Sequence, residues 1–129
     1  MAKVGDCLFC SSEFYSQEKI ICESADWYAV YDGFPVVEGH TLIIPKKHIQ
    51  SIFELSDIST LFSFIKEVKN ILDKKYSPSG YNLGINDGEH AGQTIPHLHI
   101  HMIPRYIGDF GLPCGVRNVF PPNLANYRN

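Results

Sequence analysis

Hydrophobic and polar positions follow a short period over the first third of the chain, which is typical of β-strands. β-Branched and aromatic residues fill segments 19–22 and 27–31, and the turn-forming residues 23–26 separate them. This pattern predicts a β-hairpin. Segment 40–45 is so continuously apolar that it predicts a third strand, buried on both faces.

The middle of the chain has a different period. Between residues 57 and 76, apolar side chains recur at intervals of three and four, which predicts one long amphipathic helix. Ser56 is the expected N-cap, and Pro78 and Gly80 are expected to end the helical segment. The expected apolar face consists of Ile58, Leu61, Phe62, Ile65, Val68, Ile71 and Leu72.

Two more strands are predicted after the helix. Segment 81–85 reads as the fourth strand, and a polar, glycine-bearing loop follows at 86–94. Segment 97–103 alternates as a fifth strand, which Pro104 is expected to end. Several strands around one helix predict an α+β fold with an antiparallel five-stranded sheet.

Length and composition limit what the chain can be. Its 129 residues are 44% hydrophobic and 19% charged, which predicts one folded domain over 1–129, with an irregular C-terminal tail from about residue 108. The formal net charge of −3 gives no electrostatic footprint for nucleic acid. No apolar run is long enough for a membrane span, and no signal peptide is recognised, so we expect a cytoplasmic protein.

Three histidines carry the strongest chemical signal. His97, His99 and His101 alternate with apolar residues, so on a strand their imidazoles share one face. The glycine content of the preceding loop allows backbone N–H groups to approach an anion, and this combination suits phosphate chemistry. A solvated strand face and a purely metal-binding group of imidazoles are the alternatives.

The segment His97-Leu98-His99-Ile100-His101-Met102-Ile103 resembles the signature of the histidine triad (HIT) family of nucleotidyl hydrolases and transferases. The resemblance extends from Cys7-Leu8-Phe9-Cys10 through the segment 39–45 to Pro104-Arg105, and it weakens after Asp109. Any one of these pieces is a weak signal, whereas their combination is highly specific.

The resemblance implies a two-step mechanism. His99 would attack the α-phosphorus of a nucleotide, and water would hydrolyse the nucleotidyl-imidazole intermediate. In the family, a backbone carbonyl of the His-rich segment holds the second ring proton of the nucleophile, and the residue at the position of His101 contacts the phosphate. His40 matches the fourth histidine of the family, which we expect to order the imidazole network.

The resemblance also implies a nucleotide site. The residues that match positions around the phosphates are Asn86, Gly92, Gln93 and Thr94. Asp32 looks like the ribose contact, because a carboxylate accepts hydrogen bonds from both vicinal hydroxyls. Leu8 and Phe9 resemble residues that line the base pocket. The alternatives are a turn aspartate for Asp32 and plain core packing for Leu8 and Phe9.

A second constellation overlaps the first. Cys7-x-x-Cys10 has the spacing with which two thiolates bind one zinc ion, and His48 and His97 complete a Cys₂His₂ set that some branches of the family resemble. The expected zinc is structural, and no catalytic cofactor is required. His97 would then anchor the segment that carries His99. Reduced thiols without metal are the alternative.

The motifs point to two substrate branches. The segment 92–94 resembles the dinucleoside polyphosphate hydrolases, whereas the cysteine pair and Asn86 resemble the bacterial and phosphoramidase branches. Gly115-Val116-Arg117 resembles a tail of bacterial proteins similar to diadenosine polyphosphate hydrolases, but we assign no catalytic role to Arg117.

The expected function is therefore cleavage at the α-phosphorus of adenosine-containing substrates by a homodimer, since family members pair across a two-fold axis. Two other functions stay open from the sequence. One is a non-catalytic purine nucleotide-binding module, and the other is a metal-centre enzyme that uses the histidine row.

Overall fold

A computed structural model describes residues 7–16, 18–109 and 115. Arg117 and nearly all of the expected irregular tail lie outside the described residues. The strands and the long helix are, in chain order, β1 (Ile20–Glu23), β2 (Trp27–Tyr31), β3 (Thr41–Pro45), α1 (Ser59–Tyr76), β4 (Gly80–Gly84) and β5 (Ile100–Arg105). Short 3-10 turns lie at Leu8–Cys10, Ser12–Phe14, Ile52–Glu54 and Glu89–Ala91.

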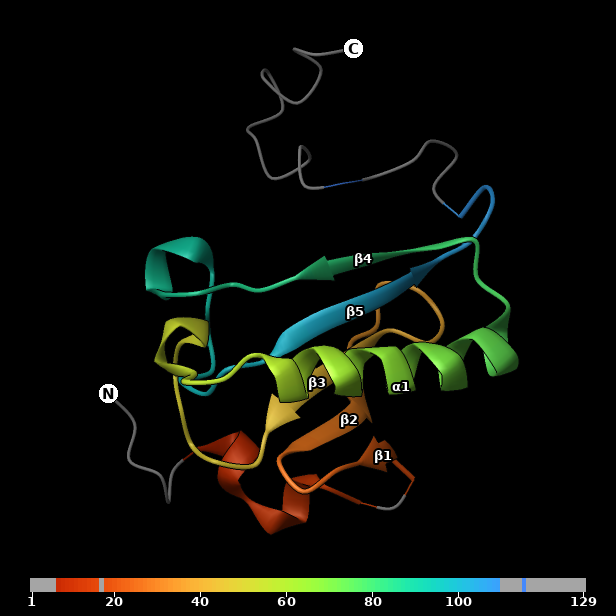
Figure 1. The fold of residues 1–129 in the computed structure, drawn as a ribbon. Coiled ribbons are helices and arrows are strands. Elements are labelled where there is room, and N and C mark those ends of the chain that lie inside the picture. The colour runs from red at the N-terminus through yellow and green to blue at the C-terminus, as the bar shows by residue number, and fades with distance from the viewer. Residues whose placement is uncertain (1–6, 17, 110–114, 116–129) are drawn as a thin grey trace.

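The five strands form one antiparallel sheet in the order β1-β2-β3-β5-β4, and α1 crosses one face of it (Figure 1). The predicted α+β class is confirmed. β5 lies between β3 and β4 although α1 separates it from β3 in sequence, so the histidine segment enters the middle of the sheet. Within the described residues, none of the helices has the length and apolar character that a membrane crossing requires.

Both faces of the sheet are covered, because alternate residues of the central strands enter two different hydrophobic clusters. Ile43 packs toward α1, whereas Leu42 and Ile44 pack with Phe9 under the N-terminal turns. All five residues of β3 are buried, as the continuous apolar run predicted. The three histidines of segment 97–101 alternate with residues that pack toward α1. They therefore lie on the opposite face of the sheet, where Phe9 packs.

The buried face of α1 differs from the expected one in one respect. Leu61, Val68 and Leu72 are buried as expected, but the fourth buried residue is Phe64, and Phe62 and Ile58 are each 61% exposed. Because Phe62 and Phe64 are separated by about 200° on a helix, only one of them can face the sheet. The spacing of apolar residues does not distinguish the two.

The N-cap prediction at Ser56 was wrong. The helix begins at Ser59, and its first free N–H groups are served by Asp57, whose carboxylate accepts the Ser59 N–H at 2.9 Å. The end of the helix agrees with the prediction. Ser77 adopts a left-handed conformation (φ 49°) directly before Pro78, which cannot continue the helix.

β5 begins later and ends later than predicted. His97 to His99 form an extended approach to the strand, and Pro104 lies inside the strand rather than after it. The register of β5 with β3 stops at Met102, so beyond that point β5 borders β4 alone and a proline is tolerated. Gly39 packs on Pro104: its φ is +88°, and a Cβ there would come within 2.9 Å of the Pro104 ring.

Candidate functional site

The histidine row divides into two groups on the same side of the sheet. The three imidazoles do lie on the Phe9 side, as the alternation predicted, but His97 turns toward the N-terminal cysteines. His99 and His101 stay together, with ring centroids 5.4 Å apart, and His101 also contacts His40. The structure therefore separates an anchoring cluster from a cluster with free ring nitrogens.

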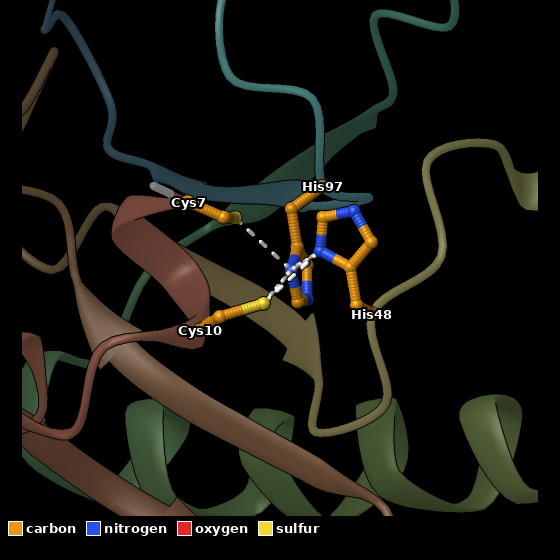
Figure 2. Close-up of side chains that lie close together, drawn as sticks. All are labelled: Cys7, Cys10, His48 and His97. Atoms are coloured by element: carbon orange, nitrogen blue, oxygen red, sulfur yellow. Dashed lines mark hydrogen bonds between the residues drawn. The ribbon is translucent and has the colours of Figure 1, made fainter. Parts of the chain in front are cut away.

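The first group consists of Cys7, Cys10, His48 and His97, whose side chains converge on one point (Figure 2). The cysteines come from the Leu8–Cys10 turn, His48 follows β3, and His97 precedes β5. Both thiols lie 3.5 Å from His97 Nδ1. His48 Nδ1 lies 3.0 Å from Cys10 Sγ and 3.2 Å from His97 Nδ1.

These separations fit a tetrahedral metal site. With Zn–S near 2.3 Å and Zn–N near 2.0 Å, tetrahedral ligands are about 3.6 Å apart for sulfur and nitrogen and about 3.3 Å apart for two nitrogens. The donor set of two thiols and two imidazoles is one that zinc prefers. The predicted ligand set is thus assembled in the structure, and these four residues could hold a metal ion.

Two further features describe the protons of the cluster. The second ring nitrogen of His97, Nε2, lies 2.8 Å from the Pro45 carbonyl, so its N–H is held there and Nδ1 faces the cluster unprotonated. This is the usual arrangement around metal-binding histidines. Burial, with the neighbouring Cys7 thiol, raises the pKa of Cys10 to about 11, so this thiol stays protonated at neutral pH unless a positive charge lies beside it.

His99 lies beyond this cluster with one ring nitrogen fixed. Its Nδ1 lies 2.9 Å from the backbone carbonyl of His97, which can only accept a hydrogen bond. Neutral His99 therefore carries its proton on Nδ1 and has a lone pair on Nε2. The imidazole is 8% exposed, and the ring of Phe9 packs against it edge-on at 5.1 Å.

His101 is fixed in the opposite tautomer by a chain of hydrogen bonds. The Val36 backbone N–H donates to His40 Nδ1 at 3.0 Å, so neutral His40 carries its proton on Nε2. That nitrogen lies 3.0 Å from His101 Nδ1, which therefore accepts. Neutral His101 thus carries its proton on Nε2. Burial lowers the pKa of both His40 and His101, which keeps the two rings neutral.

Asp32 closes the second group. Its Oδ2 lies 3.4 Å from His40 Nε2 and 3.9 Å from His101 Nδ1, and its Oδ1 accepts the Phe34 N–H at 2.9 Å. Asp32, His40 and His101 are close enough to surround a metal ion. The Val36 N–H argues against that use, because a metal on His40 Nε2 would require the ring proton on Nδ1, where Val36 already donates.

The two residues expected at the base differ in exposure. Leu8 is 49% exposed, whereas Phe9 is buried against the rings of His97 and His99. Phe9 therefore packs in the core and also lies beside the His99 imidazole. Leu8, the preceding residue, is open to solvent.

Two of the residues expected around the phosphates offer free polar side chains in the 86–94 loop. Asn86 and Thr94 are exposed, and no hydrogen bond within the described part of the chain engages either side chain. Asn86 follows Gly84 by two residues, and Gly84 pairs with His101, so the chain leads Asn86 toward the histidine row. Gly92 has a φ of +96°, which a side chain would strain, and its α-carbon lies beside the Asn86 amide.

Gln93 uses its side chain within the protein. Its Oε1 accepts the Gly88 N–H at 2.8 Å, and its Nε2 donates to the carbonyls of Gln50 and Ile95. Gln93 therefore shapes the loop. Sequence reasoning did not identify Asp87, which accepts hydrogen bonds from Ser51; the Ser-x-x-Glu capping box starting at Ser51 was the one readable signal nearby.

Comparison with known proteins places this geometry in a family. The model of the HIT domain matches residues 13–108. The chain is 41% identical over 78 residues to a bis(5'-nucleosyl)-tetraphosphatase [asymmetrical] of Schizosaccharomyces pombe, covering 59% of this chain and 43% of that enzyme. The chain thus spans less than half the length of that relative.

Solved structures agree with the sequence match. A HIT family protein from Bacillus anthracis superposes with a TM-score of 0.72 at 35% identity, covering 95% of this chain and 92% of the other. A Zn-bound histidine triad family protein from Mycobacterium smegmatis superposes with a TM-score of 0.73 at 28% identity, covering 84% and 81%. The chain belongs to the HIT domain family.

Proposed function

We propose that this chain is a nucleotidyl hydrolase that cleaves adenosine-containing dinucleoside polyphosphates or nucleoside phosphoramidates at the α-phosphorus, with His99 as the nucleophile. One observation carries the proposal: the His97 carbonyl holds the His99 Nδ1 proton at 2.9 Å, and this leaves the Nε2 lone pair free. The related protein of Schizosaccharomyces pombe is a bis(5'-nucleosyl)-tetraphosphatase, which supports dinucleoside polyphosphates as the substrate class.

The opposite tautomers of His99 and His101 suit the two halves of the first step. His99 Nε2 forms a bond to the α-phosphorus while the bond from phosphorus to the leaving group breaks. The His101 Nε2–H hydrogen-bonds to the leaving oxygen or nitrogen and stabilises the negative charge that develops there, and the departed group takes its proton from water. His40 returns no proton itself; it holds His101 in the donating tautomer.

The second step releases His99. Water attacks phosphorus and gives up a proton to the solvent, and the bond from phosphorus to His99 Nε2 breaks. The nucleotidyl-imidazole is a cation whose proton stays on Nδ1, where it donates a hydrogen bond to the His97 carbonyl, so His99 leaves as a neutral ring. Atoms and protons balance over the two steps, and the net reaction is hydrolysis.

In the same proposal, the nucleotide lies between Asp32 and the 86–94 loop. Asp32 accepts from the ribose hydroxyls, and Asn86, Thr94 and backbone groups near Gly92 face the phosphates. Phe9 borders the base. The exposure of Asn86 and Thr94 supports this placement, and the internal hydrogen bonds of Gln93 give that residue an indirect role.

The Cys7, Cys10, His48 and His97 group is proposed as a structural zinc site. When bound, zinc would neutralise the two thiolates and fix the N-terminal turn to the approach of β5. Four protein ligands leave no position for a reacting water, so the chemistry stays with His99 and His101. The fit of the four ligand atoms supports zinc, and the Zn-bound histidine triad neighbour is consistent with it.

We also propose a homodimer. β4 is an edge strand of the sheet, and its residues Leu83 and nearby Ile85 are 50% and 37% exposed. Ile58, directly before α1, and Phe62, in the first turn of α1, are also exposed. An unpaired edge with apolar neighbours favours pairing with a second copy. The molar mass in solution, measured by light scattering, tests this assembly.

The experiment for the function compares the purified chain with His99→Ala on diadenosine tri- and tetraphosphate and on an adenosine phosphoramidate. We expect the wild type to turn over at least one substrate and to show a nucleotidyl adduct in quenched intact-protein mass spectra. His99→Ala should lose both, with turnover reduced by about 10⁴-fold or more.

His90→Ala is the matched control, because His90 is an exposed histidine. We expect it to keep turnover and adduct. Nucleotide binding without any turnover in the wild type would instead support a regulatory binding module. Turnover that survives in His99→Ala would show that the nucleophile is assigned wrongly.

A further inference from the structure

A short segment, residues 48–52, connects the cysteine and histidine cluster with the 86–94 loop. At the cluster end, His48 contributes a ring nitrogen to the candidate metal group. The next residue, Ile49, accepts the Leu98 N–H through its carbonyl at 2.7 Å. The segment is thus held beside the approach to β5 by a hydrogen bond directly after its candidate ligand.

At the other end, the same segment holds the 86–94 loop. The Gln50 carbonyl accepts from Gln93 Nε2 at 2.9 Å. The Asp87 carboxylate accepts the Ser51 hydroxyl at 2.9 and 3.0 Å and the Ile52 N–H at 2.9 Å. Three consecutive residues of the segment therefore contact the loop through polar bonds.

Gln93 and Asp87 are the two loop residues in these bonds. Their side-chain oxygens and hydrogens already bond within the protein and are not available to a nucleotide. Gln93 uses Oε1 for the Gly88 N–H and both Nε2 hydrogens for carbonyls. Asp87 carries a negative charge that would repel a phosphate, and its oxygens face donors of the 48–52 segment. Asn86 is adjacent to Asp87, and Thr94 is adjacent to Gln93, so these bonds fix the neighbours that are free.

We infer that Asp87 and Gln93 are positioning residues, and that through residues 48–52 they couple metal binding at Cys7, Cys10, His48 and His97 to nucleotide binding at the 86–94 loop. The inference rests on the proposed nucleotide site. A metal that fixes His48 restricts the segment, and the segment restricts the loop. By thermodynamic linkage, a bound nucleotide must then stabilise the bound metal by the same factor.

The first test measures that reciprocal effect on the metal-loaded chain, with AMP as the probe. The zinc that stays bound at equilibrium with a competing chelator is measured with and without saturating AMP. We expect AMP to raise the zinc affinity of the wild type by about tenfold, within the usual range of coupling between sites. In Asp87→Ala and Gln93→Ala, AMP at its own saturating concentration should change the zinc affinity less than twofold.

Two control variants separate positioning from general loosening. Asp57→Ala removes another carboxylate that accepts a backbone N–H, but at the start of α1, so it should keep the tenfold effect. Asp87→Asn keeps one oxygen that can accept the Ile52 N–H, so an intermediate effect is expected. A tenfold effect in Asp87→Ala would overturn the inference, and so would the absence of any effect in the wild type.

The second test needs no nucleotide. Hydrogen exchange of the Ile52 and Gly88 amides reports the two bonds of the network. We expect Cys10→Ser, which removes a candidate metal ligand, and Asp87→Ala to accelerate exchange at both amides. Unchanged exchange in Cys10→Ser would show that the cluster does not order the loop.

The two tests also separate failure of this inference from failure of the proposed function. If calorimetry shows that the wild type does not bind AMP, the proposed nucleotide site is wrong, and the exchange experiment alone decides whether the cluster orders the loop. If AMP binds and the coupling is absent, the nucleotide site stands and the positioning role of Asp87 and Gln93 is rejected.

Discussion

His97 and His99 are two residues apart, lie on the same side of the sheet and are both nearly inaccessible to solvent, with 0% and 8% exposure. Their partners differ. His97 has one ring nitrogen against Pro45 and the other against the cysteines and His48, so both are committed within the protein. His99 has one nitrogen on the His97 carbonyl, and its Nε2 has no hydrogen-bond partner among the described residues.

The comparison teaches that residue type and burial do not assign a role to a histidine. What assigns it is the number of ring nitrogens that the fold engages. An imidazole with both nitrogens engaged is an anchor, and one with a fixed proton and a free lone pair is suited to attack phosphorus. The anchor also fixes the proposed nucleophile directly, because the carbonyl that holds the Nδ1–H of His99 belongs to His97.

The largest expected effect is a difference in stability between the variants His97→Ala and His99→Ala. His97→Ala should lose the proposed structural zinc and lower the free energy of unfolding by about 3 kcal/mol or more, because it removes a buried ring, its bond to Pro45 and a candidate metal ligand. His99→Ala should cost about 1–2 kcal/mol. Denaturant unfolding and metal analysis measure both. Equal losses of stability, with zinc retained in His97→Ala, would contradict the comparison.

A smaller effect is expected at Asp32. Asp32→Asn removes the charge that faces His40 and one acceptor for the ribose, so KM for an adenosine substrate should rise about tenfold. The same substitution should change KM little for a 2',3'-dideoxyadenosine analogue, which lacks both hydroxyls. Steady-state kinetics on the two substrates measure the difference. An equal rise in KM for both would assign Asp32 to the imidazole chain alone.

The smallest effect is a shift in pH dependence. Burial lowers the pKa of His40 and His101 from 6.5, and Asp32 opposes this shift in both. Since the neutral rings are the working forms, kcat/KM should be insensitive to these groups from pH 8 to 6.5 and should fall only below pH 6.5. In Asp32→Asn the acid limb should move to still lower pH. A limb centred above 6.5 in the wild type would contradict the assigned tautomers.

Much of the molecule was predictable from local patterns. The strand periods and the apolar spacing of α1 predicted five strands and one helix, because the spacing of apolar residues differs between a strand and a helix. The Cys7-x-x-Cys10 pair and the histidine row likewise named part of the two clusters, whereas His40 and Asp32 were expected only from the resemblance to the family. Phe62 and Phe64 show the limit, since both fit an apolar helix and only packing on the sheet selects Phe64.

The sequence by itself determined which residues are available for chemistry: the cysteine pair, the histidines and the polar loop. Tertiary structure decided how each is used. Backbone groups distant in sequence, the Pro45 carbonyl for His97 and the Val36 N–H for His40, fix which ring nitrogen is protonated. Such bonds depend on where two chain segments meet, and backbone atoms are the same in every residue, so no pattern of side chains records them.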